Sequence, residues 1–206
     1  MQAIDTIFYI AILVMSVVVH EISHGFMAEY FGDKTARYAG RLTLNPIKHL
    51  DLFGSILMPA ILVLAKAPFL FGWAKPVPYN PNNLSNKRWG EMWVAAAGVI
   101  SNLFLAVFFG VVLRFSVSIY APESFLVILA LIIKVNLGLA IFNLVPIPPL
   151  DGSKILFSFL PRSMYPLVAF LEQYSLFLLI IFIVFFSEYL YPAFYFLYNL
   201  IIGLPL

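Results

Sequence analysis

The stretch VMSVVVHEISHGFMAEYFGD, residues 14–33, places His20, Glu21 and His24 inside an otherwise apolar run. The run continues the apolar residues before it and favours one long helix. Residues four apart on a helix lie about one turn apart on nearly the same face. His20 and His24 can therefore direct their imidazoles at a single point, with the Glu21 carboxylate at its edge.

The composition of the chain indicates the solvent around this helix. Of 206 residues, 63% are hydrophobic and 11% are charged, and the mean hydropathy is +0.98. Soluble domains are about half apolar and about one quarter charged. The net charge of +2 is too small to indicate a nucleic-acid partner. The sequence predicts an all-α polytopic membrane protein in the cell membrane, organised as one domain over residues 1–206.

Long uncharged runs recur along the chain, and roughly 20 apolar residues are needed to cross a hydrocarbon core about 30 Å thick. The aromatic tail, residues 189–206, lies in the membrane interface or forms a broken sixth span. Basic residues divide equally between the two sides of such a bundle, so the orientation is left open. We expect about five transmembrane helices, near residues 5–31, 52–71, 89–115, 124–145 and 166–186.

Two shorter elements are expected between the spans. The sequence RLTL, residues 41–44, alternates polar and apolar residues and precedes the turn-forming pair Asn45–Pro46. We therefore expect a short β-strand or hairpin near Tyr38–Asn45. Prolines at 146, 148 and 149 end the fourth span, and a short helix follows near Ser153–Leu160.

The HEISH segment, residues 20–24, has the spacing with which two histidines bind zinc while the glutamate acts on the metal-bound water. The alternative is that His20, Glu21 and His24 are polar residues packed against neighbouring helices. A charged residue at the centre of a membrane span costs about 2.5–3.5 kcal/mol, so such residues usually mark functional sites. The membrane setting therefore favours the metal site.

A catalytic zinc site needs a third protein ligand, and the chain contains no cysteine to provide it. Met27 and Tyr30 stand where the extended zincin pattern requires glycine and histidine, so that class is excluded. Asp151 is favoured, because it follows proline-interrupted backbone that must be buried in protein or line a wet cavity. Its alternative role is to cap the helix that follows. The other candidates are Glu29, Asp33, His49 and Asp51.

Three segments, HEISH, AAAGVISN (residues 95–102) and NLVPIPPLDG (residues 143–152), together resemble the signature segments of the site-2 protease family of intramembrane zinc metalloproteases. The connecting segments NPIKHLDLFGSILMP and GWAKPVPYNP resemble its short prokaryotic branch, which lacks PDZ and CBS domains. The resemblance extends from about Val17 to Leu160. Within AAAGVISN it departs from many relatives at Val99, where they have proline.

The resemblance implies one Zn²⁺ per chain, bound by His20, His24 and Asp151, with Glu21 as the catalytic acid and base. It implies that Asn143 contacts the substrate backbone, and it suggests Asn102 as a further substrate-binding residue. The implied substrate is a transmembrane protein, cleaved in or next to its membrane segment during regulated intramembrane proteolysis.

Two other functional classes remain open at this stage. A polytopic metal-ion transporter would also bury histidine and acidic residues in its spans, although such proteins usually contain repeated halves and none is visible here. A non-catalytic membrane binding module would be expected to lack a ligand or the base. Lys134, inside the fourth span, could line a water path, but a snorkelling side chain is the commoner case.

Overall fold

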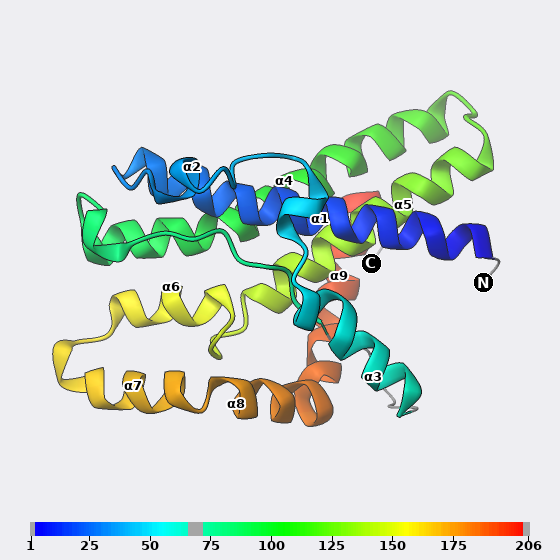
Figure 1. Cartoon of the computed structure of the whole chain (residues 1–206). Coiled ribbons are helices and arrows are strands. Elements are labelled where there is room, and N and C mark those ends of the chain that lie inside the picture. Colours follow the sequence, from blue (N-terminus) through cyan, green and yellow to red (C-terminus); the bar gives the residue numbers. More distant parts are fainter. Residues whose placement is uncertain (1–2, 66–71, 204–206) are drawn as a thin grey trace.

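The computed structural model describes residues 3–65 and 72–203 (Figure 1). Within those ranges all regular structure is helical and no strand is present, so the all-α prediction is confirmed. The α-helices are α1 (Ala3–Tyr30), α2 (Thr35–Tyr38), α3 (Met58–Leu64), α4 (Lys87–Ser118), α5 (Glu123–Asn143), α6 (Asp151–Phe159), α7 (Tyr165–Gln173), α8 (Ser175–Ile181) and α9 (Tyr191–Ile202).

Among the described residues, three helices are long and apolar enough to cross a membrane: Ile7–Tyr30 of α1, the whole of α4 and the whole of α5. They confirm the first, third and fourth predicted spans. Gly32 has a left-handed backbone (φ 102°) two residues after α1 ends, as glycines that close a helix commonly do.

The prediction of five spans is not supported by the described residues. The last predicted span is a pair of helices, Arg162–Gln173 and Ser175–Phe185, bent by 70°, and counting it as one span gives at most four. In place of the second predicted span, the π-helical turn Leu52–Leu57 leads into α3. The rest of that prediction, residues 66–71, lies outside the described ranges.

Short and bent helices explain why apolar composition overestimated the number of spans. Pro59 occupies the first turn of α3 and Pro192 that of α9, where a missing N–H is tolerated and a new helix begins. The 12 residues of α9 reach only about 18 Å at 1.5 Å per residue, well short of a membrane core. Within the described part of the tail, Tyr191–Ile202 therefore form a short helix that packs against α4 and α5.

The predicted β-strand near Tyr38–Asn45 is wrong. Arg41 and Leu42 are irregular, Thr43 and Leu44 form bends, and none of the four makes ladder hydrogen bonds. A strand would place Leu42 and Leu44 on one buried face, but Leu44 is 60% exposed while Arg41 is buried and donates a hydrogen bond to the Lys75 carbonyl. The prediction depended on alternating polar and apolar residues over only four positions. The burial of Arg41 does not fit that alternation.

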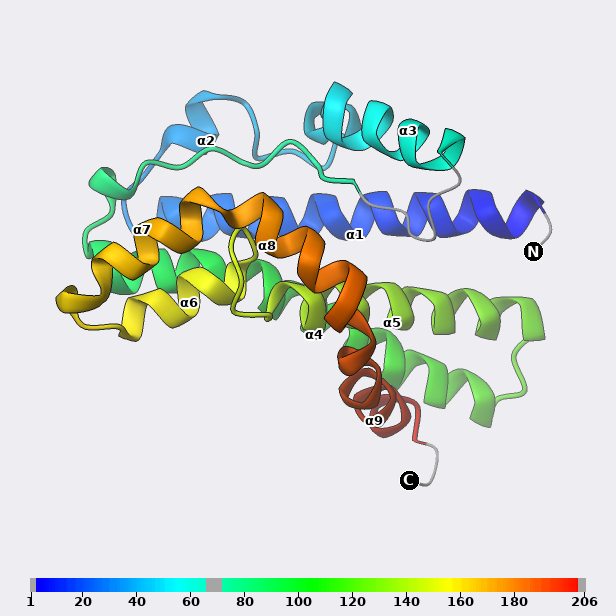
Figure 2. The same ribbon diagram turned by 90° about the horizontal axis from the view of Figure 1, so that it is seen from below.

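The three long helices pack side by side, with α4 in contact with both α1 and α5 (Figure 1). In Figure 2, α2 and α3 lie on one side of α1, and α4 and α5 lie on the other. The outer face of α4 exposes Phe104, Phe108, Val111 and Phe115, which recur at helical spacing. An exposed apolar stripe of this length is the face that a lipid-embedded helix presents to the bilayer.

Candidate metal centre

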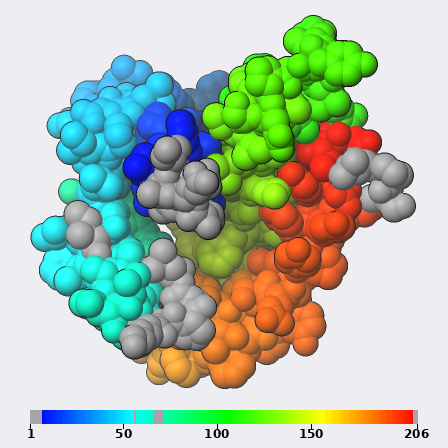
Figure 3. Space-filling view, turned by 90° about the vertical axis from the view of Figure 1, so that its right-hand side faces the viewer, coloured from blue at the N-terminus to red at the C-terminus, as the bar shows by residue number. Residues whose placement is uncertain are grey.

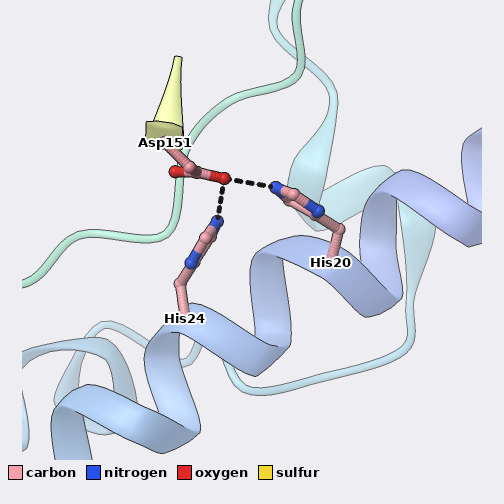
Figure 4. Close-up of side chains that lie close together, drawn as sticks. All are labelled: His20, His24 and Asp151. Carbon is pink, nitrogen blue, oxygen red and sulfur yellow. Dashed lines mark ion pairs between the residues drawn. The ribbon is translucent and has the colours of Figure 1, made fainter. Parts of the chain in front are cut away.

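Three potential ligands from two distant parts of the chain meet at one point (Figure 4). The Nε2 atom of His20 lies 3.1 Å from Oδ2 of Asp151, and the Nε2 atom of His24 lies 3.4 Å from the same oxygen. One ligand atom from each residue lies within 4.8 Å of the others. The predicted ligands His20, His24 and Asp151 are thus brought together, with the histidines on successive turns of α1.

The opposite nitrogen of each imidazole contacts a carbonyl oxygen. Nδ1 of His20 lies 2.5 Å from the Asn102 side-chain oxygen, and Nδ1 of His24 lies 2.6 Å from the Val94 main-chain oxygen. Because a carbonyl oxygen only accepts, we assign the proton of each neutral ring to Nδ1. Each Nε2 then directs a lone pair at the centre, which is the usual arrangement of metal-binding histidines.

This arrangement of donors fits a divalent cation. Oδ2 of Asp151 is buried and has no hydrogen-bond donor among the described residues. When each imidazole carries its proton on Nδ1, the two Nε2 lone pairs and the Asp151 oxygen face one another with no hydrogen atom between them. Two imidazole nitrogens and one carboxylate oxygen are the ligand set of a catalytic zinc site, with a fourth position left for water.

Glycine at position 98 makes the close crossing of α1 and α4 possible. A Cβ atom on Gly98 would lie 2.5 Å from Cε1 of His24 and 2.6 Å from Cε1 of His20. Asn102 follows one turn later on α4 and contacts His20, so two residues of the AAAGVISN segment shape and orient the imidazoles.

Asp151 reaches the site because α5 ends at Asn143 and the chain folds back through turns to begin α6. A Cβ atom on Gly152 would collide with the main chain of Leu144, so only glycine permits this close return. Asp151 also lies in the first turn of α6, where the helix N-terminus favours a negative charge. Its alternative role as an N-cap is not adopted, since Leu150 occupies that position.

Glu21 lines the same pocket as the three ligands. Its Oε2 atom accepts a hydrogen bond of 2.8 Å from the main-chain N–H of Val77. The pocket has a volume of about 520 Å³ and is mostly apolar, with Asn143 and Lys154 among its other polar lining residues. The site therefore combines three potential ligands, a further carboxylate on Glu21 and a mostly apolar pocket.

Asn102 is placed differently from Asn143. It is fully buried, does not line the pocket, and donates a hydrogen bond of 2.8 Å to the side chain of Asn136 while its oxygen contacts His20. Asn136 in turn donates to Ser16, which ties α4, α5 and α1 together behind the site. This environment suits a residue that orients His20 rather than one that touches a substrate.

The other candidate ligands are engaged elsewhere. Glu29 forms an ion pair with Arg37, and Asp51 accepts a hydrogen bond from the main chain of Phe53. His49 is buried with its Nε2 atom 2.9 Å from the Thr43 carbonyl oxygen, and it borders a second pocket of about 610 Å³. This second pocket lies between α1, α5 and residues 46–59, where the surface in Figure 3 is hollowed.

Asp33, another rejected ligand, fixes the segment that covers the site. Its carboxylate accepts hydrogen bonds from the main chain of Asn80 and from the side chains of Thr35 and Asn83. Burial alone would raise the pKa of Asp33, but these hydrogen bonds outweigh it and hold the pKa below its usual value. The anchored segment, residues 72–80, carries the Val77 N–H that holds Glu21.

Comparisons with known proteins agree with this geometry. The model of "Peptidase family M50" matches residues 8–125 and 117–186. The chain is 40% identical over 170 residues to "Putative zinc metalloprotease YwhC" of Bacillus subtilis (strain 168), covering 79% of this chain and 74% of that protein. It is 30% identical over 148 residues to "Putative zinc metalloprotease Rip2" of Mycolicibacterium smegmatis (strain ATCC 700084 / mc(2)155), covering 71% of this chain and 54% of that protein. No solved structure gives a significant match.

The matched residues include the HEISH helix, the AAAGVISN segment and the NLVPIPPLDG segment that contains Asp151. The family match and the convergence of three ligands make the chain a zinc metalloprotease of the membrane. The chain belongs to peptidase family M50, the family of the site-2 proteases.

Proposed function

We propose that the chain hydrolyses peptide bonds in or next to the transmembrane segments of other membrane proteins, with one Zn²⁺ bound by His20, His24 and Asp151. The observation that carries this proposal is the approach of two Nε2 atoms and one carboxylate oxygen at 3.1 and 3.4 Å in a pocket that also holds Glu21. Zinc bound there would supply Lewis acidity and lower the pKa of a water molecule toward about 7.

The side chains of the chain then have separate tasks. Glu21 accepts the proton of the attacking water and passes it to the leaving amine nitrogen, so that one peptide bond and one water give a carboxylic acid and an amine. The Val77 N–H holds one oxygen of Glu21 and leaves the other for this transfer. Asn102 and the Val94 carbonyl orient the two imidazoles, as acceptors behind metal-binding histidines do.

The substrate must arrive as an unwound segment, because a helix hides its carbonyl groups within its own hydrogen bonds. The mostly apolar pocket suits the side chains of such a segment, and Asn143, on its wall, offers an amide to the substrate backbone. A test is Asn143→Ala, which we expect to reduce turnover while zinc stays bound. Unchanged turnover would remove Asn143 from the substrate site.

We further propose that the chain is one multi-pass domain of the cell membrane and that it acts in regulated intramembrane proteolysis. The three candidate spans and the family support this assignment. A metal-ion transporter is disfavoured because Glu21 lies beside the three proposed ligands without being one of them. A permease does not need such an acid. A non-catalytic module is disfavoured because both the ligands and Glu21 are retained.

The decisive experiment compares wild type with Glu21→Gln in purified form, using a single-span membrane protein as substrate. We expect Glu21→Gln to bind zinc like wild type and to lose cleavage by at least about 100-fold, in line with general acid–base contributions. Cleavage that persists in this variant would exclude the proposed role of Glu21. Transport of zinc into proteoliposomes without any cleavage by wild type would favour the permease.

A further inference from the structure

Lys154 is a cation in the active-site pocket to which the mechanism above gives no task. It lies on α6 three residues after Asp151, so the two side chains leave the same face of the helix with Cβ atoms about 5–6 Å apart. Lys154 lines the pocket together with Glu21 and Asn143. Among the described residues that line this pocket, no other lysine or arginine is present.

The charge of Lys154 is held in place without being neutralised. Its Nζ atom lies 5.3 Å from the centroid of the Tyr79 ring, in the segment that covers the site. A cation over an aromatic face is attracted to it and keeps its full charge. Within residues 3–65 and 72–203, no carboxylate lies within 4.0 Å of the Lys154 ammonium. The group therefore retains donors for a ligand in the pocket.

The chemistry of the site determines which ligand gains most from such a donor. When water adds to the scissile carbonyl, a C–O bond forms and the carbonyl π pair moves onto the oxygen, which becomes an oxyanion. A fixed donor near that oxygen lowers the barrier, because it interacts more strongly with the transition state than with the bound substrate. A lysine ammonium carries three donors and no acceptor, so it suits this role and cannot act as a base while protonated.

We propose that Lys154 is a catalytic residue that donates a hydrogen bond to the oxyanion formed from the scissile carbonyl. The ammonium keeps its proton throughout. The oxyanion pair returns to re-form the carbonyl when the C–N bond breaks, and Glu21 delivers the proton to the leaving nitrogen. This inference rests on the proposed proteolytic function. It adds a second positive charge, besides that of the proposed zinc ion, to stabilise the oxyanion of the substrate.

The experiment compares wild type with Lys154→Met, Lys154→Arg and, as a matched control, Lys75→Met. Lys75 is exposed, lies in the same covering segment as Tyr79 and does not line the pocket. Zinc content, kcat and KM are measured for each protein. A phosphinic pseudopeptide, whose anionic oxygens imitate the tetrahedral state, and the reduced-amide analogue of the same sequence, which has no such oxygen, provide binding measurements independent of turnover.

We expect Lys154→Met to retain zinc and KM within about twofold and to lose kcat by about 10- to 100-fold, the range of one charge-assisted hydrogen bond to an oxyanion. The phosphinic analogue should bind more weakly by a similar factor, whereas the reduced-amide analogue should bind unchanged. Lys154→Arg should recover part of the loss, and Lys75→Met should behave like wild type.

Three results would overturn the inference: an unchanged kcat in Lys154→Met, an equal loss of affinity for both analogues, or a loss of zinc. The first denies a role in the reaction, and the other two make Lys154 a structural residue. Each can be told from failure of the proposed function, because in these cases wild type still cleaves and Glu21→Gln does not. Absence of cleavage by wild type refutes the proposed function itself.

Discussion

Substitution of Gly98 by alanine tests how the zinc site depends on the crossing of α1 and α4. The added methyl group would stand 2.5 Å from Cε1 of His24 and 2.6 Å from both Cε1 and Nε2 of His20. Non-bonded carbon atoms prefer about 3.5–4.0 Å, so the two rings must retreat by about 1 Å. Zinc–nitrogen bonds tolerate only about 0.2 Å of displacement.

The expected cost follows from this overlap. Forcing an extra methyl group into a packed site costs about 1–3 kcal/mol, and about 1.4 kcal/mol corresponds to a tenfold change in affinity. We therefore expect Gly98→Ala to weaken zinc binding by about 5- to 100-fold. The helix itself should not suffer, because alanine is favoured over glycine in a helix by up to about 1 kcal/mol.

The assay is competition for zinc between the purified protein and a chromophoric chelator. Gly138→Ala is the matched control, because a Cβ atom there meets only Cε2 of Phe194 at 3.9 Å, an ordinary contact. Gly138→Ala should bind zinc like wild type. If Gly98→Ala binds zinc within twofold of wild type and of this control, the histidines are not confined as the structure describes, and the reasoning fails.

The remaining predictions concern the residues that orient the site. Asn102→Ala should weaken zinc binding by about tenfold or more, because Nδ1 of His20 loses its acceptor, whereas Asn102→Asp should retain most of the affinity in the same competition assay. Asp33→Asn should lower the free energy of unfolding at pH 7 by about 2 kcal/mol, because several donors lose a charged acceptor. Since the pKa of Asp33 is lowered by folding, its contribution is present above the ordinary value of about 4 and is lost on acidification. Denaturant unfolding should therefore show the two proteins converging as the pH falls below about 4, and equal stabilities at pH 7 would contradict this role.

Helix periodicity and the positions of the prolines were enough to predict which side chains meet at the candidate metal site. The spacing of His20 and His24 fixes their relative position on any helix, and the prolines before Asp151 predicted non-helical backbone there. The structure confirms that these three side chains meet. The zinc assignment and the family were also predicted from the motifs and are confirmed by the comparisons.

The residues that orient the ligands could not be predicted in the same way. Val94 and Val77 act through main-chain atoms, which no pattern of side chains reports. The role of Gly98 depends on where α4 crosses α1. The sequence of α4 alone does not predict that crossing point. The contact of Asn102 with His20 depends on the same crossing; the family resemblance suggested Asn102 as a substrate-binding residue, and in the structure it is buried behind His20.

The number of spans and the predicted strand failed for a related reason. Hydropathy reports how apolar a segment is, but it does not report that the helix Leu52–Leu64 is short or that the helices on either side of Tyr174 are bent by 70°. In RLTL, alternation over four residues is overridden by one buried arginine that binds the main chain of Lys75. Tertiary contacts decide both cases, and a single sequence does not display them.

The central claim is that two imidazoles and one carboxylate of this chain hold a single zinc ion inside a membrane protein. Zinc K-edge X-ray absorption on the purified protein tests it most directly. The account predicts one zinc per chain with two imidazole nitrogens and oxygen ligands at about 2.0–2.2 Å. A zinc ion with fewer than two imidazole ligands, or a protein that binds no zinc at all, would contradict it.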